Sequence, residues 1–200
     1  MSGAEPALAD LADRLSRHRP WRLPGRRRID RAAVAVVLAE RPEGLSVLLV
    51  RRAEREGDPW SGDMGFPGGR LQSDDDRTVA AACRECREET GLVISPADRI
   101  GRLSDRLTRS HARPRPMVVT PYVFAARDAE PEWDLNHEVR ETLWLPLAFL
   151  ADRRNRGRML WRIGPVPLPM PRYDYRGRRV WGLTLLMLDE LVRLYRRVPS

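Results

Sequence analysis

Three glutamates, Glu85, Glu88 and Glu89, fall close together on one predicted helix. At about 100° of rotation per residue, the three carboxylates share an arc of roughly 100° on that helix. Like charges three and four residues apart repel each other, so we expect a cation to offset them. Carboxylate oxygens are the ligands that Mg²⁺ and Mn²⁺ prefer, and Mg²⁺ commonly adds substrate phosphates. The pattern predicts a divalent-cation site; a solvated acidic face paired with nearby arginines is the alternative.

A glycine pair precedes these glutamates. Gly68 and Gly69 follow a Phe-Pro dipeptide in a segment that is rich in glycine and proline. Because glycine has no side chain, its backbone can approach the acidic helix and offer a carbonyl oxygen to the same cation. The helix is predicted from about residue 76 to residue 90, since Gly91 is a suitable residue just past a helix C-terminus.

The segment around these residues resembles the Nudix box, usually written G-x5-E-x7-R-E-U-x-E-E-x-G-U with U aliphatic. The matching positions are Arg84, Glu85, Glu88, Glu89, Gly91 and Leu92, with Cys86 at the aliphatic position. The interval from Gly69 to Arg84 is one residue longer than in the standard box. The early acid, which is the first E of the pattern, therefore corresponds to Asp75 when counted from the glycine and to Asp76 when counted back from the arginine. The branch similar to coenzyme A pyrophosphatases has the same extra residue, and the resemblance covers about residues 32 to 195.

This resemblance implies a pyrophosphohydrolase that uses Mg²⁺ or Mn²⁺ and acts on a small nucleotide, because divalent ions neutralise phosphates and lower the pKa of water. The branch points to coenzyme A or a derivative, which would give 3′,5′-ADP and 4′-phosphopantetheine. ADP-ribose, NADH or another nucleotide is the alternative substrate. A non-catalytic nucleotide-sensing domain is a further alternative, although a sensor need not keep all three carboxylates.

The match to the family also implies roles for individual residues. The implied metal ligands are Glu85, Glu88, Glu89 and the carbonyl of Gly69. Arg84 would pair with a box carboxylate and hold its rotamer. The general base is either a box glutamate (Glu88 or Glu89) or an acid on a distant loop, for which Glu138 is the candidate. The implied substrate-binding residues are Arg52, Arg55, Phe66, Gly68 and Gly69.

Two positions depart from the upstream signature of that branch. Ala53 stands where the signature has serine, and Asp58 stands where it has arginine. Arg55 is the nearby arginine that could compensate after a shift. These departures bear on coenzyme A specificity and leave the Nudix chemistry unchanged.

Cys83 and Cys86 have the spacing of a redox or zinc motif. Zinc needs about four ligands and no second cysteine pair accompanies them, while a thioredoxin-type pair opens a helix rather than lying inside it. We therefore expect two small side chains that pack in the core. With only two cysteines in the chain, a disulfide framework is excluded and a reducing cytoplasm is expected. Trp60 and Trp133 are likewise expected to pack rather than to stack on a base.

The composition is strongly basic, with 36 arginines, no lysine and a formal net charge of +8 over 200 residues. The arginines alternate with acids along the chain, so we favour coding bias over a polyanion surface and expect no specific nucleic-acid partner. No apolar run approaches the roughly 20 residues that span a bilayer, and no secretory signal opens the chain. A cytoplasmic enzyme without membrane association is expected.

The order of elements suggests a mixed α+β sandwich, and the resemblance implies the Nudix fold, an α/β/α sandwich with a mixed β-sheet between helices. Helices are predicted over residues 5–18, 76–90 and 181–196, and strands over residues 33–38, 45–50, 99–106, 117–126 and 139–145. The proline-rich residues 164–171 are expected to be irregular. Residues 1–30 are interpreted as an N-terminal helix and Arg/Pro-rich linker, which covers the domain or mediates a homodimer, and residues 31–198 as the Nudix hydrolase domain.

Overall fold

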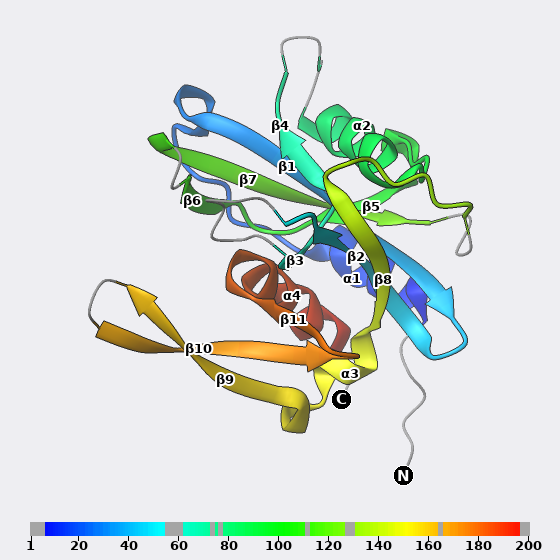
Figure 1. Ribbon diagram of the computed structural model, residues 1–200. Helices are drawn as coiled ribbons and strands as arrows, with labels where there is room; N and C mark the ends of the chain where they lie inside the picture. Colours follow the sequence, from blue (N-terminus) through cyan, green and yellow to red (C-terminus); the bar gives the residue numbers. More distant parts are fainter. Residues whose placement is uncertain are drawn as a thin grey trace.

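The computed structural model describes residues 7–54, 62–72, 75, 78–110, 113–126, 131–163 and 166–196 (Figure 1). A mixed β-sheet has helices on both faces, so the predicted α+β sandwich is confirmed. The helices are α1 Leu8–Arg17, α2 Thr78–Thr90, α3 Leu147–Ala151 and α4 Gly182–Arg196. The strands of this sheet are β1 Asp30–Arg41, β2 Gly44–Arg52, β3 Met64–Gly65, β4 Gly68–Arg70, β5 Arg99–Arg102, β6 Arg106–Ser110, β7 Arg113–Ala125 and β8 Val139–Pro146.

Strand β1 organises this sheet. It forms the predicted antiparallel hairpin with β2 through the turn that ends at Gly44, and it runs parallel to β7 along most of its length. The short strand β4 pairs antiparallel with the first half of β1, with Val34 opposite Gly68 and Ala33 opposite Gly69. This pairing fixes the glycine pair at the centre of the sheet, next to helix α2.

Side chains of β1 alternate between two hydrophobic clusters, because successive residues of a strand point to opposite faces. Ala33, Ala35 and Val37 pack under α2, against its residues Val79, Ala82, Cys83 and Cys86. Val36 and Leu38 pack on the other face, against α1, α3 and α4. The helical arc predicted to face the core therefore does so, and Glu88 on the opposite side of α2 stays exposed.

The two cysteines lie inside the cluster under α2. Both are free and buried, and burial raises the pKa of the Cys86 thiol to about 12. The prediction of two small packing side chains is confirmed.

Among the described residues, no helix is both long and apolar enough to cross a bilayer.

Helix α1 packs into the same hydrophobic core as the sheet and α4. Leu11 and Leu15 are 0% and 3% exposed and belong to the cluster beneath α4. Arg14 donates hydrogen bonds to the carbonyl oxygens of Leu194 and Tyr195, over 3.0 and 2.9 Å. The N-terminal helix thus covers the domain, as one of the two sequence interpretations predicted; the division at residue 30 stays a prediction.

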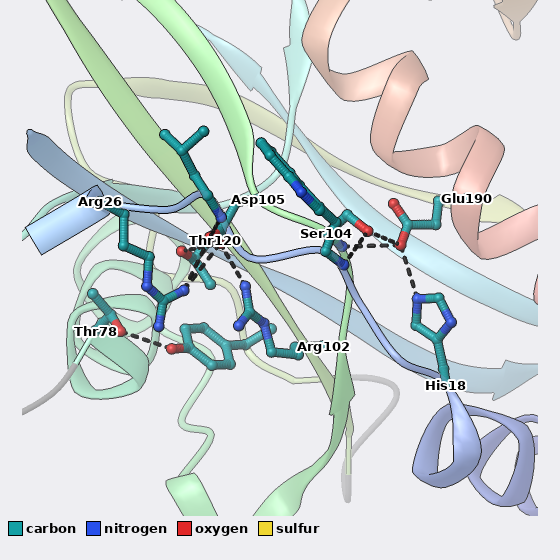
Figure 2. A network of polar contacts seen from close by, with 11 residues as sticks. His18, Arg26, Thr78, Arg102, Ser104, Asp105, Thr120 and Glu190 are labelled. Carbon is teal, nitrogen blue, oxygen red and sulfur yellow. Dashed lines mark hydrogen bonds and ion pairs between the residues drawn. The ribbon is translucent and has the colours of Figure 1, made fainter.

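A buried carboxylate fastens the linker that follows α1 (Figure 2). Asp105 is 2% exposed and accepts hydrogen bonds from the backbone N–H of Leu23, the hydroxyl of Thr120 and the guanidinium groups of Arg26 and Arg102. Burial acts to raise the pKa of Asp105, but these donors outweigh it and hold the pKa below its ordinary value. The linker is therefore held on the sheet by charge as well as by packing.

A three-stranded antiparallel sheet follows α3, where the sequence predicted an irregular segment. Its strands are β9 Arg156–Ile163, β10 Val166–Tyr175 and β11 Arg178–Trp181, with β10 in the middle. The irregular interpretation of residues 164–171 is wrong for the described part, residues 166–171. Pro167, Pro169 and Pro171 alternate along β10, and this stretch pairs with β9 alone. Alternate prolines remove N–H donors from one edge only, and that edge has no partner strand among the described residues.

Candidate active site

The glycine pair of β4 lies against both the sheet and helix α2. A Cβ at Gly68, where φ is +157°, would come within 2.4 Å of the Ala33 carbonyl oxygen. A Cβ at Gly69 would lie 2.3 Å from Oε1 of Glu85. The backbone therefore reaches the acidic helix only because both positions are glycine, as the sequence pattern predicted.

Glu89 is the most enclosed of the three helix glutamates. It is 8% exposed, and its Oε2 accepts a hydrogen bond from the Gly68 N–H over 3.0 Å. Burial raises the pKa of Glu89 to about 8; the charges of Glu85 and Glu138 add to this effect, while the Gly68 hydrogen bond and the charge of Arg52 oppose it. A cation beside this carboxylate would favour its ionised form.

Arg84 balances the remaining acids of the helix. Its Nη1 donates to Oε1 of Glu85 over 2.9 Å and to Oε2 of Glu88 over 3.0 Å, and its Nη2 donates to Oδ2 of Asp75 over 3.1 Å. Burial acts to raise the pKa of Asp75, but the hydrogen bonds from Arg84 and from the backbone outweigh it and lower the pKa. Asp75 is therefore the early acid that contacts the box helix, while Asp76 lies outside the described residues.

A pocket of about 400 Å³ opens beside Glu89. Its walls join residues that are distant in the sequence: Arg52, Phe66, Gly68, Gly69, Glu89 and Glu138. Trp181 to Thr184 form another wall, at the N-terminal end of α4, where a helix carries partial positive charge. The pocket thus combines acidic side chains with groups that attract anions, a combination suited to a phosphate ligand accompanied by cations.

A sequence model of the NUDIX domain matches residues 29–161. The chain belongs to the Nudix family. The Nudix domain makes it a pyrophosphohydrolase, and the box helix with its glycine pair is the part of the fold that carries the family pattern.

Known relatives agree with this assignment. The chain is 31% identical over 166 residues to the mitochondrial coenzyme A diphosphatase NUDT8 of Homo sapiens, a match that covers 82% of this chain and 68% of that protein. It is 29% identical over 164 residues to the uncharacterized Nudix hydrolase NudL of Yersinia pestis, with 82% and 78% coverage. The crystal structure of a MutT/nudix family protein from Enterococcus faecalis superposes with a TM-score of 0.57 at 20% identity, over 96% of this chain and 70% of that one, which supports the Nudix fold.

The residues of the Nudix box fit a hard divalent cation by type. Three carboxylates and the carbonyl of a glycine that contacts one of them are oxygen ligands, which is the ligand type that Mg²⁺ and Mn²⁺ prefer. Within the described part of the chain, however, no three side chains of the ligating types gather around one point. The reason is that Glu85 and Glu88 turn toward Arg84, which supplies the positive charge in this conformation.

The structure tests where the predicted residues lie. It brings Arg52, Phe66, Glu138 and the glycine pair to one pocket together with Glu89, although Phe66 is only 7% exposed and packs mainly in the core. Arg84, Glu85 and Glu88 lie on α2 beside this pocket, outside its described walls. Predicted features that fall outside the described residues are Arg55, Asp58, Trp60 and Asp76.

Trp133 packs against Trp144, with ring centroids 6.5 Å apart, as predicted. Sequence reasoning missed Arg70, Thr108 and Met117, which also line the pocket. Thr108 and Met117 are paired across β6 and β7. No local motif marks them, because only strand pairing brings them to the site.

Proposed function

We propose that this chain hydrolyses the pyrophosphate bond of coenzyme A or a coenzyme A derivative, and releases 3′,5′-ADP and 4′-phosphopantetheine. The observation that carries the reaction is the pocket that joins Glu89, the glycine pair and Arg52. The substrate is supported by similarity to the human coenzyme A diphosphatase over most of the chain.

The proposed reaction needs a held phosphoanhydride and an activated water molecule. Water attacks one phosphorus atom, the bond from that phosphorus to the bridging oxygen breaks, and the second phosphate leaves as an anion. Arg52 in the pocket wall is proposed to bind a phosphate, because a guanidinium donates paired hydrogen bonds to phosphate oxygens. The N-terminal end of α4, which also lines the pocket, adds partial positive charge.

Divalent cations, Mg²⁺ or Mn²⁺, complete this proposal. Glu85, Glu88, Glu89 and the Gly69 carbonyl would hold them, and the ions would neutralise phosphate charge and lower the pKa of water. Arg84 is a positioning residue, because its hydrogen bonds orient the carboxylates of Glu85 and Glu88.

Glu138 is the proposed base that accepts the proton of the attacking water. It precedes β8, lines the pocket, and its side chain is 46% exposed, so water can reach it. Its charge also acts on Glu85 and Glu89, which places it within electrostatic reach of the box carboxylates. The alternative base is a box glutamate, Glu88 or Glu89.

A second candidate keeps the chemistry and changes the substrate to ADP-ribose, NADH or another nucleotide. The observation that favours it is Asp58, which stands where the coenzyme A signature has arginine. An aspartate in place of that arginine removes a positive charge, which disfavours a substrate that carries an additional phosphate.

The test is a panel of coenzyme A, ADP-ribose, NADH, dinucleoside polyphosphates and nucleoside triphosphates, each assayed with Mg²⁺ and with Mn²⁺. We expect the highest kcat/KM for coenzyme A, with both named products identified by mass. Faster cleavage of ADP-ribose or NADH would select the second candidate.

The site is tested with Glu89→Gln, which should lower kcat at least about 100-fold while the circular dichroism spectrum is retained. Glu132→Gln is the matched control, because Glu132 is exposed and lies outside the pocket walls. Near-normal turnover of Glu89→Gln would refute the proposed ligand set. Glu138→Gln should lower kcat without weakening Mg²⁺ binding, whereas loss of Mg²⁺ binding would make Glu138 a ligand instead of the base.

A further inference from the structure

A second cleft, of about 910 Å³, lies between α4 and the hairpin of β9 and β10. Figure 1 shows this hairpin, in yellow and orange, running along the side of α4. The cleft shares no lining residue with the candidate active site. It is formed by the sheet that the sequence did not predict, so no motif pointed to it.

Arginine dominates the lining of this cleft. The six arginines are Arg106, Arg153, Arg156, Arg158, Arg193 and Arg196. Asp189 is the single acid in the described lining, and it pairs with Arg156, with Nη2 and Oδ2 2.9 Å apart. Arg106 pairs with Glu190 over 2.7 Å. Two of the six positive charges are therefore compensated.

Three of the remaining arginines have no ion pair with any described residue. Arg153, Arg158 and Arg193 are exposed around the cleft, on the turn before β9, on β9 and on α4. Arg196 donates to the carbonyl oxygen of Ala151, and its charge also acts on the carboxylate of Asp152. Three positive charges without an ion pair to a described residue thus converge from the turn before β9, from β9 and from α4, which coding bias does not explain.

The lining of the cleft combines a polar donor with apolar side chains. The Nε of Arg106 is buried and has no hydrogen-bond acceptor. Pro169, Pro171, Leu186 and Val192 supply apolar surface beside it, and Leu186 is 48% exposed. A ligand that fills this space would need both negative oxygens for the arginines and an apolar or aromatic part for the floor.

We propose that this cleft is a second binding site, separate from the active site, for a small organic polyphosphate of the nucleoside diphosphate or triphosphate class. Guanidinium groups match phosphate oxygens in geometry and charge, and several of them can share one polyphosphate chain. The concave shape favours a small molecule, and the apolar floor favours one with an attached base over inorganic phosphate.

Calorimetric titration of the full chain in EDTA tests the site without metal-dependent hydrolysis. ADP is the probe, and inorganic pyrophosphate is the probe without the base. The double variant Arg158→Gln/Arg193→Gln should weaken ADP binding about tenfold or more, because each arginine would donate charge-assisted hydrogen bonds. Arg27→Gln/Arg28→Gln is the matched control, since it removes the same charge from two exposed arginines outside both pockets, and it should leave ADP affinity unchanged.

The possible outcomes separate this site from its competitors. An Arg52→Gln variant that keeps ADP binding in EDTA would support a site outside the catalytic pocket. Equal weakening by the cleft variant and its control would overturn the proposal in favour of general charge attraction. Equal affinity for ADP and pyrophosphate would overturn the proposal that the cleft prefers an organic polyphosphate with an attached base. Tight, cleft-dependent binding of a single-stranded oligonucleotide without ADP binding would assign the surface to nucleic acid and overturn it as well.

Discussion

Replacing Glu89 with glutamine is expected to stabilise the metal-free protein, and increasingly so as the pH rises. Burial raises the pKa of Glu89 from 4.5 to about 8 in the folded chain. Below pH 4.5 the carboxyl is protonated in both the folded and the unfolded state, so its titration does not change the free energy of unfolding. Between the two values the unfolded chain ionises while the folded chain keeps its proton, so the free energy of unfolding falls as the pH rises.

The magnitude follows from the width of this window. Each pH unit inside it lowers the free energy of unfolding by about 1.4 kcal/mol, and about 2.5 units lie below pH 7, which gives roughly 3 kcal/mol at that pH. Glutamine has the same shape and can still accept the Gly68 hydrogen bond through its amide oxygen. Glutamine does not ionise, so the free energy of unfolding of the variant should exceed that of the parent protein by about 3 kcal/mol at pH 7. At pH 4.5 the two should be nearly equal.

Urea unfolding in EDTA at pH 5, 6 and 7.5 measures this difference. Glu88→Gln is the control, because that side chain is 52% exposed and loses little solvation on folding. Added Mg²⁺ should shrink the gap between Glu89→Gln and the parent, since an ion bound to the native carboxylates stabilises the parent by mass action. A difference that stays constant from pH 5 to 7.5, or that favours the parent, would refute the reasoning.

Three further substitutions test other parts of the structure. Gly69→Ala should lower kcat at least about tenfold, because its Cβ would meet Glu85 at 2.3 Å, whereas Gly157→Ala, whose Cβ has 3.8 Å of clearance, should not. Leu11→Ala should lower the free energy of unfolding in urea by about 2 to 4 kcal/mol, since the side chain is fully buried. A loss near zero would show that the packing of α1 does not contribute to the stability of the core. Asp105→Asn should lower the free energy of unfolding by about 3 kcal/mol in the same measurement, because two partly buried guanidinium groups would lose their counter-charge; an unchanged midpoint would contradict the network of Figure 2.

The acidic face of α2 could be predicted because it depends on local geometry. Glu85, Glu88 and Glu89 share a face as soon as the segment is helical, and Gly91 marks where that helix ends. The glycine pair is also a local signal, since the absence of a side chain at Gly69 is the condition for its contact with Glu85. The β1–β2 hairpin was predictable for the same reason, from two apolar runs and a short turn.

Residues from other elements reach the site through long-range pairing, which periodicity does not encode. Glu138 is carried to the pocket by β8, which pairs with β2, and Thr108 and Met117 by the pairing of β6 with β7. The proline-rich strand β10 was missed because prolines normally break a ladder. They are tolerated here because they face an edge without a partner among the described strands.

The sequence by itself determined the helix that gathers three carboxylates, the glycines that let the backbone approach them, and hence the family and its chemistry. Only the tertiary structure decided that burial raises the pKa of Glu89, and that three arginines without an ion pair to a described residue converge on a second cleft. The physical reason is range: helix geometry acts over three or four residues, whereas burial and charge compensation depend on segments brought together from opposite ends of the chain.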